Sequence, residues 1–171
     1  ARLQSGQLKL HREWQPVEEV IGSAIAACTS ILKKRPVQVQ LSKNLPLVEF
    51  DAVLIERVLA NLIENAVKYD PSNTPIQICV QTQDRELYVT VSDHGPGIPL
   101  GKERLIFEKF ERGTSESVIS GVGLGLSICQ AIVQAHGGTI YSHNREKGGA
   151  SFTFTLPLGF PPGIEAGQDG S

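Results

Sequence analysis

Two asparagines and a lysine lie on one face of a predicted helix. In the segment "LIERVLANLIENAVKY" (54–69), Asn61, Asn65 and Lys68 fall within roughly 60° of one another at about 100° per residue. Asparagine is a poor helix former, and a solvated face more naturally carries Glu, Lys and Gln. One interpretation is an amide oxygen for a hard cation such as Mg²⁺, with a lysine beside it for phosphate. The alternative is an exposed polar stripe.

A carboxylate followed by spaced glycines forms the second pattern, "DHGPGI" (93–98). Asp93 ends a predicted strand, and Gly95 and Gly97 permit a tight loop that a ligand can approach closely. A carboxylate at the bottom of a pocket can accept a hydrogen bond from an exocyclic amine such as that of adenine. A plain Asp-x-Gly turn is the alternative interpretation.

Alternating glycines form the third pattern, "GVGLGL" (121–126), which opens a predicted helix. Gly121, Gly123 and Gly125 leave backbone N–H groups uncovered at a helix N-terminus, and such a terminus suits a phosphate. Leu126 stands where the dinucleotide fingerprint needs its third glycine, and a loop precedes the motif instead of a strand. The P-loop ending Gly-Lys-Ser/Thr is absent from the chain. A flexible hinge with a tightly packed helix start is the alternative.

Periodicity predicts the elements that position these patterns. Helices are expected over 16–35, 52–69 and from the glycine stretch to His136, with Asp51 as an N-cap and Gly137-Gly138 as a C-cap. Strands are expected over 36–42, 76–82, 86–93, 139–144 and 150–157, with a short one near Val48. Neighbouring strand pairs favour an α+β fold, a two-layer sandwich in which three helices cover a mixed, mostly antiparallel sheet of about five strands.

Composition excludes several classes of protein. The 171 residues are 40% hydrophobic and 20% charged, which is typical of a soluble domain with a substantial core. A net charge of −2 argues against a nucleic-acid binder. No apolar run approaches the roughly 18 to 20 residues that span a bilayer, and no signal peptide opens the chain. Three scattered cysteines, at 28, 79 and 129, are expected to be reduced thiols.

The order and spacing of four boxes resemble a known family. The boxes are "NLIENAVKY" (61–69), "DHGPGI" (93–98), "FEKFERG" (107–113) and "GVGLGL" (121–126). This arrangement resembles the ATP-binding catalytic domain of sensor histidine kinases, the Bergerat-fold family also found in gyrase B, heat-shock chaperones and MutL. The resemblance covers about residues 16 to 158, and the surrounding sequence is most similar to the potassium-responsive sensor kinases.

The resemblance implies a role for each matched residue. Asn65 would ligate Mg²⁺, Asn61 would lie beside it near the phosphates of ATP, and Lys68 would contact phosphate. Tyr69 would pack at the edge of the nucleotide and Asp93 would bind the adenine amine. The remaining nucleotide-binding positions would be Gly95, Gly97, Ile98, Gly121, Val122, Gly123, Leu124, Gly125 and Leu126. Lys109 and Arg112 are lid cations that would reach the γ-phosphate when a long ATP lid closes.

The resemblance also favours phosphate transfer over hydrolysis. Relatives that hydrolyse ATP carry a glutamate one turn before the Mg²⁺-binding asparagine, where it activates water. Here that position is Asn61, which is not a general base. Our hypothesis is that Glu64 assists an acceptor histidine instead.

The acceptor histidine is expected on another domain. His11, His94, His136 and His143 all lack the phosphoacceptor context of the family. We therefore expect 1–15 to be the end of a preceding dimerisation and phosphoacceptor helix with its linker, 16–159 the catalytic domain, and 160–171 a flexible tail. His136 is expected to close a helix, and His94 to have a local role beside the adenine pocket.

The expected partners follow from this organisation. They are the chain's own phosphoacceptor domain and a response regulator, in a homodimeric full-length protein, with no nucleic acid and no membrane contact by this domain. The domain would be the cytoplasmic part of an inner-membrane-anchored bacterial protein in potassium or osmotic signalling. Two alternatives stay open: a Bergerat-type ATPase or chaperone-like switch, and a protein-binding module that has lost its nucleotide.

Overall fold

The computed structural model describes residues 9–98, 101 and 122–161, without the side chains of 122–124. In chain order the elements are β1 (Glu13–Gln15), α1 (Val17–Ala27), α2 (Thr29–Leu32), β2 (Val37–Leu41), β3 (Val48–Phe50), α3 (Ala52–Tyr69), β4 (Ile76–Gln83), β5 (Glu86–Ser92), α5 (Val122–Ala135), β6 (Ile140–Asn144) and β7 (Ala150–Pro157).

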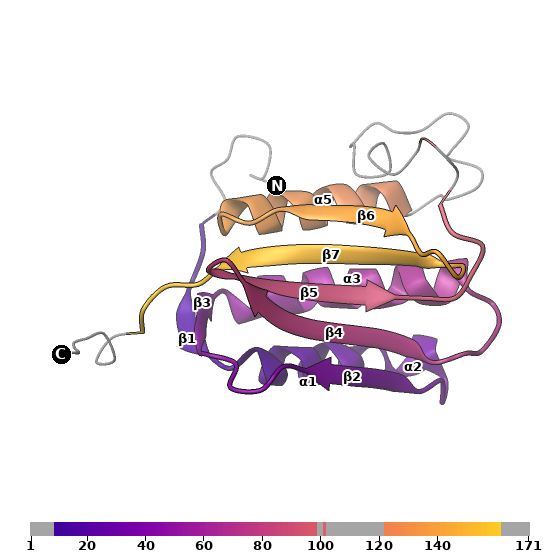
Figure 1. The fold of residues 1–171 in the computed structure, drawn as a ribbon, viewed down its shortest axis with the longest axis horizontal. Helices are drawn as coiled ribbons and strands as arrows, with labels where there is room; N and C mark the ends of the chain where they lie inside the picture. The colour runs from indigo at the N-terminus through magenta and orange to yellow at the C-terminus, as the bar shows by residue number, and fades with distance from the viewer. Residues whose placement is uncertain (1–8, 99–100, 102–121, 162–171) are drawn as a thin grey trace.

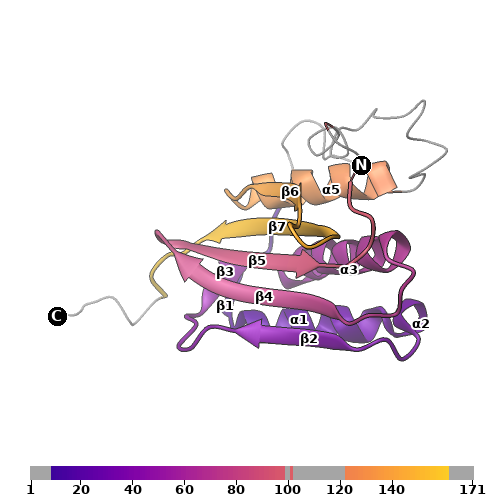
Figure 2. The ribbon, with the colours of Figure 1, turned by 45° about the vertical axis from the view of Figure 1, so that its right-hand side comes forward.

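The fold is a two-layer α/β sandwich. Five strands form one sheet in the order β2-β4-β5-β7-β6, in which only β2 and β4 run parallel. Helices α1, α3 and α5 lie on one face of this sheet, with α3 between the other two (Figures 1 and 2). The apolar core fills the space between the layers and includes Phe152 and Phe154 from β7. The predicted α+β class and mostly antiparallel sheet are confirmed.

Helix α3 spans the predicted residues and is the central helix of the layer. The Asp51 carboxylate caps it by accepting from the Leu54 N–H at 3.1 Å. Its buried side includes Ile55, Leu59 and Leu62, which are fully buried. In the described part of the chain, no helix combines the length and apolar character needed to cross a membrane.

Strands β4 and β5 form the predicted hairpin around a two-residue turn. Asp84 and Arg85 both have positive φ, 54° and 66°, and Gln83 pairs with Glu86. A type I′ turn requires positive φ at both central residues, and aspartate tolerates this conformation well. The turn also holds the residue that follows β7, because the Arg85 carbonyl accepts from Leu158 N–H at 3.0 Å.

Two local features differ from the sequence-based expectation. The helix expected over 16–35 is divided at Cys28 into α1 and α2. The Thr29 hydroxyl donates to the Ala26 carbonyl at 2.7 Å, a side-chain bond that competes with regular helix geometry. The second difference is β1, which pairs with β3 in a separate antiparallel sheet. A three-residue strand produces too little alternation to be recognised by pattern.

The C-terminus of α5 is closed by a glycine motif and a buried histidine. Gly137 has φ 85°, and the N–H groups of Gly137 and Gly138 donate to the carbonyls of Gln134 and Val133, which is a Schellman arrangement. His136 Nδ1 lies 2.8 Å from the Ile132 carbonyl, and Nε2 accepts from Asp51 N–H at 3.1 Å. The imidazole thus joins the end of α5 to the start of α3 and carries its proton on Nδ1.

Acidification should destabilise this junction. Burial, with a smaller contribution from Arg12, lowers the pKa of His136, so the unfolded chain takes up a proton before the folded chain does. Stability should therefore fall as the pH drops below about 6.5, with an upper limit of about 1.4 kcal/mol for this group at pH 5.5, one unit below the unfolded-state pKa. Urea unfolding at pH 7.5 and 5.5 measures this loss. His136→Gln should reduce the difference between the two pH values, whereas substitution of the exposed His11 by glutamine should not; an unchanged pH dependence in His136→Gln would contradict the assignment.

Candidate functional site

Helix α3 is continuous through Asn61, Asn65 and Lys68, so their spacing places them on one side of it. Asn65 is buried at 5% exposure, Asn61 is half-buried and Lys68 is exposed. Asn61 faces α5, because a Cβ added at Gly125 would lie 3.4 Å from the Asn61 Oδ1. The two helices therefore bring an amide side chain and the last glycine of the motif, Gly125, together.

Asp93 directly follows β5 and is fully buried. Its two carboxylate oxygens differ in their hydrogen bonding. Its Oδ1 accepts from the N–H groups of Gly95 (2.9 Å) and Ala150 (3.1 Å). Its Oδ2 is buried and has no hydrogen-bond partner among the described residues. Burial raises the pKa of Asp93, although the two backbone bonds oppose that effect. One oxygen is thus fixed by the fold, and the other is an acceptor without a donor.

Tyr69 and Gly95 form the wall beside Asp93. A Cβ on Gly95 would overlap the Tyr69 carbonyl oxygen, so only glycine fits against the end of α3. Burial, together with the charge of Asp93, raises the pKa of the Tyr69 phenol to about 12. The Tyr69 hydroxyl is also buried without a partner among the described residues. Two unsatisfied polar atoms therefore lie in the same region.

The glycine box is described only in part. Val122, Gly123 and Leu124 begin α5, which supports the predicted helix start at the glycine motif. The side chain of Leu126 is fully buried in the core. Ile98 is likewise a core residue at 4% exposure. Lys109, Arg112 and Gly121 lie outside the described residues.

Glu64 lies on a different part of α3 from Asn65. Adjacent helical residues are separated by about 100°, so Glu64 is turned away from the Asn65 side chain. Its charge contributes, after burial, to the raised pKa of the Cys28 thiol, which places it near α1 and α2. Glu64 is partly exposed.

Sequence reasoning missed a buried ion pair that supports the loop 93–98. Asp70 is fully buried and lies 2.9 Å from Arg35 Nη2. Its carboxylate also accepts from the His94 N–H at 2.8 Å. Burial opposes ionisation of Asp70, but hydrogen bonds from Ser72, His94 and Thr74 hold its pKa well below the usual range. Asp70-Pro71 signalled only the end of a helix, and nothing in the sequence connected Asp70 to Arg35.

A second missed group comes from the turn between β6 and β7. Asn144 bonds to the backbone of Ile98, and the Arg145 guanidinium donates to the Asp93 carbonyl at 2.8 Å. The pair Gly148-Gly149 indicates a tight turn, but it does not indicate which loop the turn contacts. The predicted local role of His94 is supported, since its backbone and ring contact Asp70 and Thr74.

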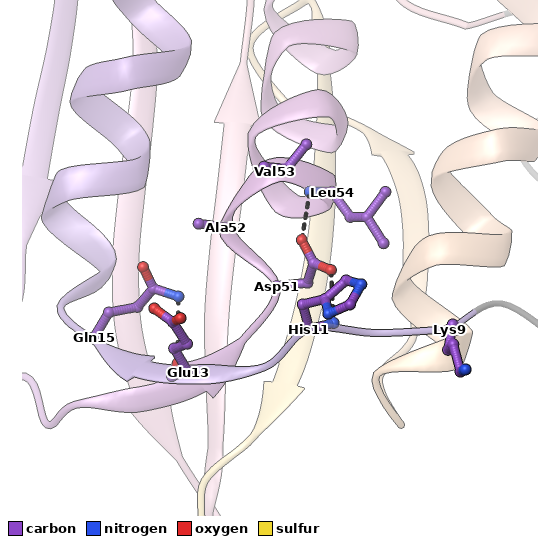
Figure 3. Close-up of a pocket in the computed structure, with 8 residues that line it drawn as sticks. All are labelled: Lys9, His11, Glu13, Gln15, Asp51, Ala52, Val53 and Leu54. Carbon is purple, nitrogen blue, oxygen red and sulfur yellow. Dashed lines mark hydrogen bonds between the residues drawn. The ribbon is translucent and has the colours of Figure 1, made fainter.

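A hollow of about 510 Å³ lies at the opposite end of α3 (Figure 3). The exposed chain that leads into β1 forms one side of it, and the start of α3 forms the other. Asp51 is at its centre, where Oδ2 accepts from the His11 N–H at 2.9 Å. Its lining mixes acidic, basic and apolar side chains and includes none of the predicted nucleotide-binding residues, so we place the candidate site at the other end of α3.

The residues present fit an adenine nucleotide with Mg²⁺. The unpartnered, buried Asp93 Oδ2 matches an amine donor such as that of adenine. Among the described residues, no three His, Cys, Asp or Glu side chains gather to hold a metal. A single amide oxygen from Asn65 instead suits Mg²⁺, because this ion takes most of its ligands from phosphates and water.

Comparison with known proteins decides the family. Residues 50–159 match the family model described as "Histidine kinase-, DNA gyrase B-, and HSP90-like ATPase". The chain belongs to this family. The matched residues include α3, the loop 93–98 and α5.

Individual members of the ATPase family match a larger share of the chain. Sensor protein KdpD of Escherichia coli K12 is 48% identical over 165 residues, which cover 96% of this chain and 18% of KdpD. Adaptive-response sensory kinase SasA of Synechocystis is 41% identical over 127 residues, 74% of this chain and 33% of SasA. The chain thus spans less than a fifth of the length of KdpD and about a third of the length of SasA.

A solved structure shows the same architecture. The solved catalytic domain of histidine kinase ThkA is 30% identical, with a TM-score of 0.71, and the match covers 88% of this chain and 96% of the ThkA domain chain. ThkA has also been solved in complex with the response regulator TrrA, where the match is 29% identical with a TM-score of 0.73 and covers 88% of this chain and 42% of that one.

Proposed function

We propose that this chain is the catalytic domain of a KdpD-like sensor kinase, which transfers the γ-phosphate of Mg²⁺-ATP to a histidine on a separate helical domain. The observation that carries the proposal is Asp93, whose Oδ1 is fixed by two backbone bonds while its buried Oδ2 has no donor. The 48% identity to KdpD supports potassium signalling, and the ThkA–TrrA complex supports relay to a response regulator.

The chain's residues would divide the work between base, phosphate and metal. Asp93 would accept from the adenine amine, and Tyr69 and Gly95 would border the base. Asn65 would hold Mg²⁺, which when bound would neutralise phosphate charge, while Lys68 and the backbone at the start of α5 would hold phosphate oxygens. Lys109 and Arg112 would act from the lid. Asn61 gives water no base, so the phosphate would await another acceptor.

The wider organisation belongs to the same proposal. Residues 1–15 would connect to a dimerisation and phosphoacceptor domain, 16–159 would form the catalytic domain and 160–171 a tail. The longer protein would be a homodimer anchored in the bacterial inner membrane, with this domain in the cytoplasm and without direct membrane or nucleic-acid contact.

The isolated chain should bind ATP with Mg²⁺ but should not phosphorylate itself. None of its histidines has the acceptor context, and His136 is buried. Calorimetric titration with ATP, with and without Mg²⁺, measures the binding. A radiolabelled γ-phosphate then tests transfer, and acid-labile label should appear only when a histidine-bearing helical domain is added.

Other outcomes would favour the alternative functions. Strong self-labelling of the 171 residues would contradict the division of roles. Slow hydrolysis without transfer would favour an ATPase-type switch, and failure to bind ATP would favour a protein-binding module.

A further inference from the structure

The loop 93–98 follows β5 and belongs to no helix or strand. Asp93 and Gly95 nevertheless need fixed positions to border a base, so contacts with other segments must hold the loop in place. One side of the loop is held by Asp70, through the His94 N–H. The other side is held by the turn between β6 and β7, which the proposed function has not used.

Asn144 pairs with both backbone groups of one loop residue. Its Oδ1 accepts from the Ile98 N–H at 2.7 Å, and its Nδ2 donates to the Ile98 carbonyl at 3.0 Å. One carboxamide thus makes the two bonds that a neighbouring strand would make in an antiparallel pair. Asparagine suits this position because its side chain carries a donor and an acceptor together.

Gly97 leaves room for this contact. It has φ 90°, and an added Cβ would lie 2.6 Å from Asn144 Oδ1. A side chain at this position would therefore displace the carboxamide from Ile98. The second glycine of "DHGPGI" is thus explained by Asn144, without any need for a contact with the base.

The adjacent residues fasten the same turn to Asp93. Arg145 Nη1 donates to the Asp93 carbonyl at 2.8 Å. Gly149 has φ 92°, and a Cβ there would overlap that same carbonyl oxygen. The turn itself is closed, since Arg145 N–H donates to the Gly149 carbonyl at 2.9 Å. Asn144 and Arg145 therefore hold the loop at its two ends.

We propose that Asn144 is a positioning residue for the nucleotide base, which it orients through the backbone of Ile98 and Gly97. This inference rests on the proposed function. It acts on the adenine end of the ligand and not on the phosphates, which α3 and α5 would bind. Loss of Asn144 should therefore weaken discrimination between bases.

Asn144→Asp is the sharpest test, because it keeps the shape and the Oδ1 acceptor but places a carboxylate oxygen against the Ile98 carbonyl. ATP affinity should fall roughly tenfold, because the bond from Nδ2 to the Ile98 carbonyl is lost and a repulsion between the carboxylate and that carbonyl replaces it. Affinity for GTP, which the parent should bind weakly, should change little, so the ratio of the two affinities should narrow. Amide hydrogen exchange at Ile98 should accelerate in the free variant.

The matched control is His143→Ala, because His143 is the exposed neighbour on β6 and pairs with Ser151 of β7. It should leave both affinities unchanged. Asn144→Ser, measured with thermal unfolding, provides a second variant if the aspartate does not fold. Parental ATP affinity in a folded variant, or equal weakening of ATP and GTP, would overturn the inference. A parent chain that fails to bind ATP would overturn the proposed function as well.

Discussion

Replacing Asp93 with asparagine should weaken ATP binding by roughly 100-fold, because a buried donor would then face the amine of the base. Oδ1 is already engaged by Gly95 and Ala150, so an asparagine would keep its oxygen there and place its Nδ2 at the position of Oδ2. Two donors would oppose each other in a buried site. Calorimetric titration of the variant with Mg²⁺-ATP measures the loss.

The same substitution should leave the free chain at least as stable at pH 7. Burial raises the pKa of Asp93, so its ionised form costs stability at neutral pH, and that cost disappears as the pH falls below the folded-state pKa. Asparagine removes the charge, so the thermal unfolding midpoint should be equal or higher. Asp84→Asn, the same change in the exposed β4–β5 turn, is the control, and ATP affinity like the parent's in Asp93→Asn would rule out the adenine contact.

Substituting Glu64 by glutamine should slow phosphate transfer by roughly 100-fold or more while sparing ATP affinity. A positioned general base contributes about 10² to 10⁴ in rate, and glutamine keeps the shape without the basicity. Glu64 is turned away from Asn65, so binding of metal and nucleotide should not depend on it. The measurement is the rate of acid-labile phosphate appearing on an added histidine-bearing domain, with ATP affinity measured in parallel.

Glu56→Gln provides the matched control, since Glu56 lies two turns earlier on α3 and its charge also raises the pKa of Cys28. It should transfer phosphate at the parental rate. A fully active Glu64→Gln variant would remove Glu64 from the mechanism, whereas equal losses in both variants would indicate a general electrostatic effect of acidic residues on this face.

The parts of the fold that sequence predicted well are those with local causes. The helix over 52–69 was predicted because its cap, its apolar face and its end at Asp70-Pro71 all lie within the segment. The β4–β5 hairpin and the glycine closure after His136 have similarly local signals. Spacing along one helix likewise predicted the shared face of Asn61, Asn65 and Lys68.

The parts that sequence missed depend on contacts between distant segments. Arg35 and Asp70 pair over a separation of 35 residues, and Asn144 and Ile98 pair over a separation of 46 residues. These residues fit the local pattern of their own segments, so the sequence gives no sign of either pairing. The roles of Gly121, Lys109 and Arg112 stay predictions, because these residues lie outside the described part of the chain.

The long-range support of the loop 93–98 has a consequence for how the chain folds. Its contacts join residues 46 apart for Ile98 with Asn144 and 57 apart for Asp93 with Ala150. Such contacts form late, because the entropy of closing long loops must be overcome first. A fragment that lacks β6 and β7 would therefore keep the contact of the loop with Asp70 but lose those with Asn144, Arg145 and Ala150. A ligand that requires this loop would stabilise the whole sandwich against unfolding, in proportion to the logarithm of its concentration.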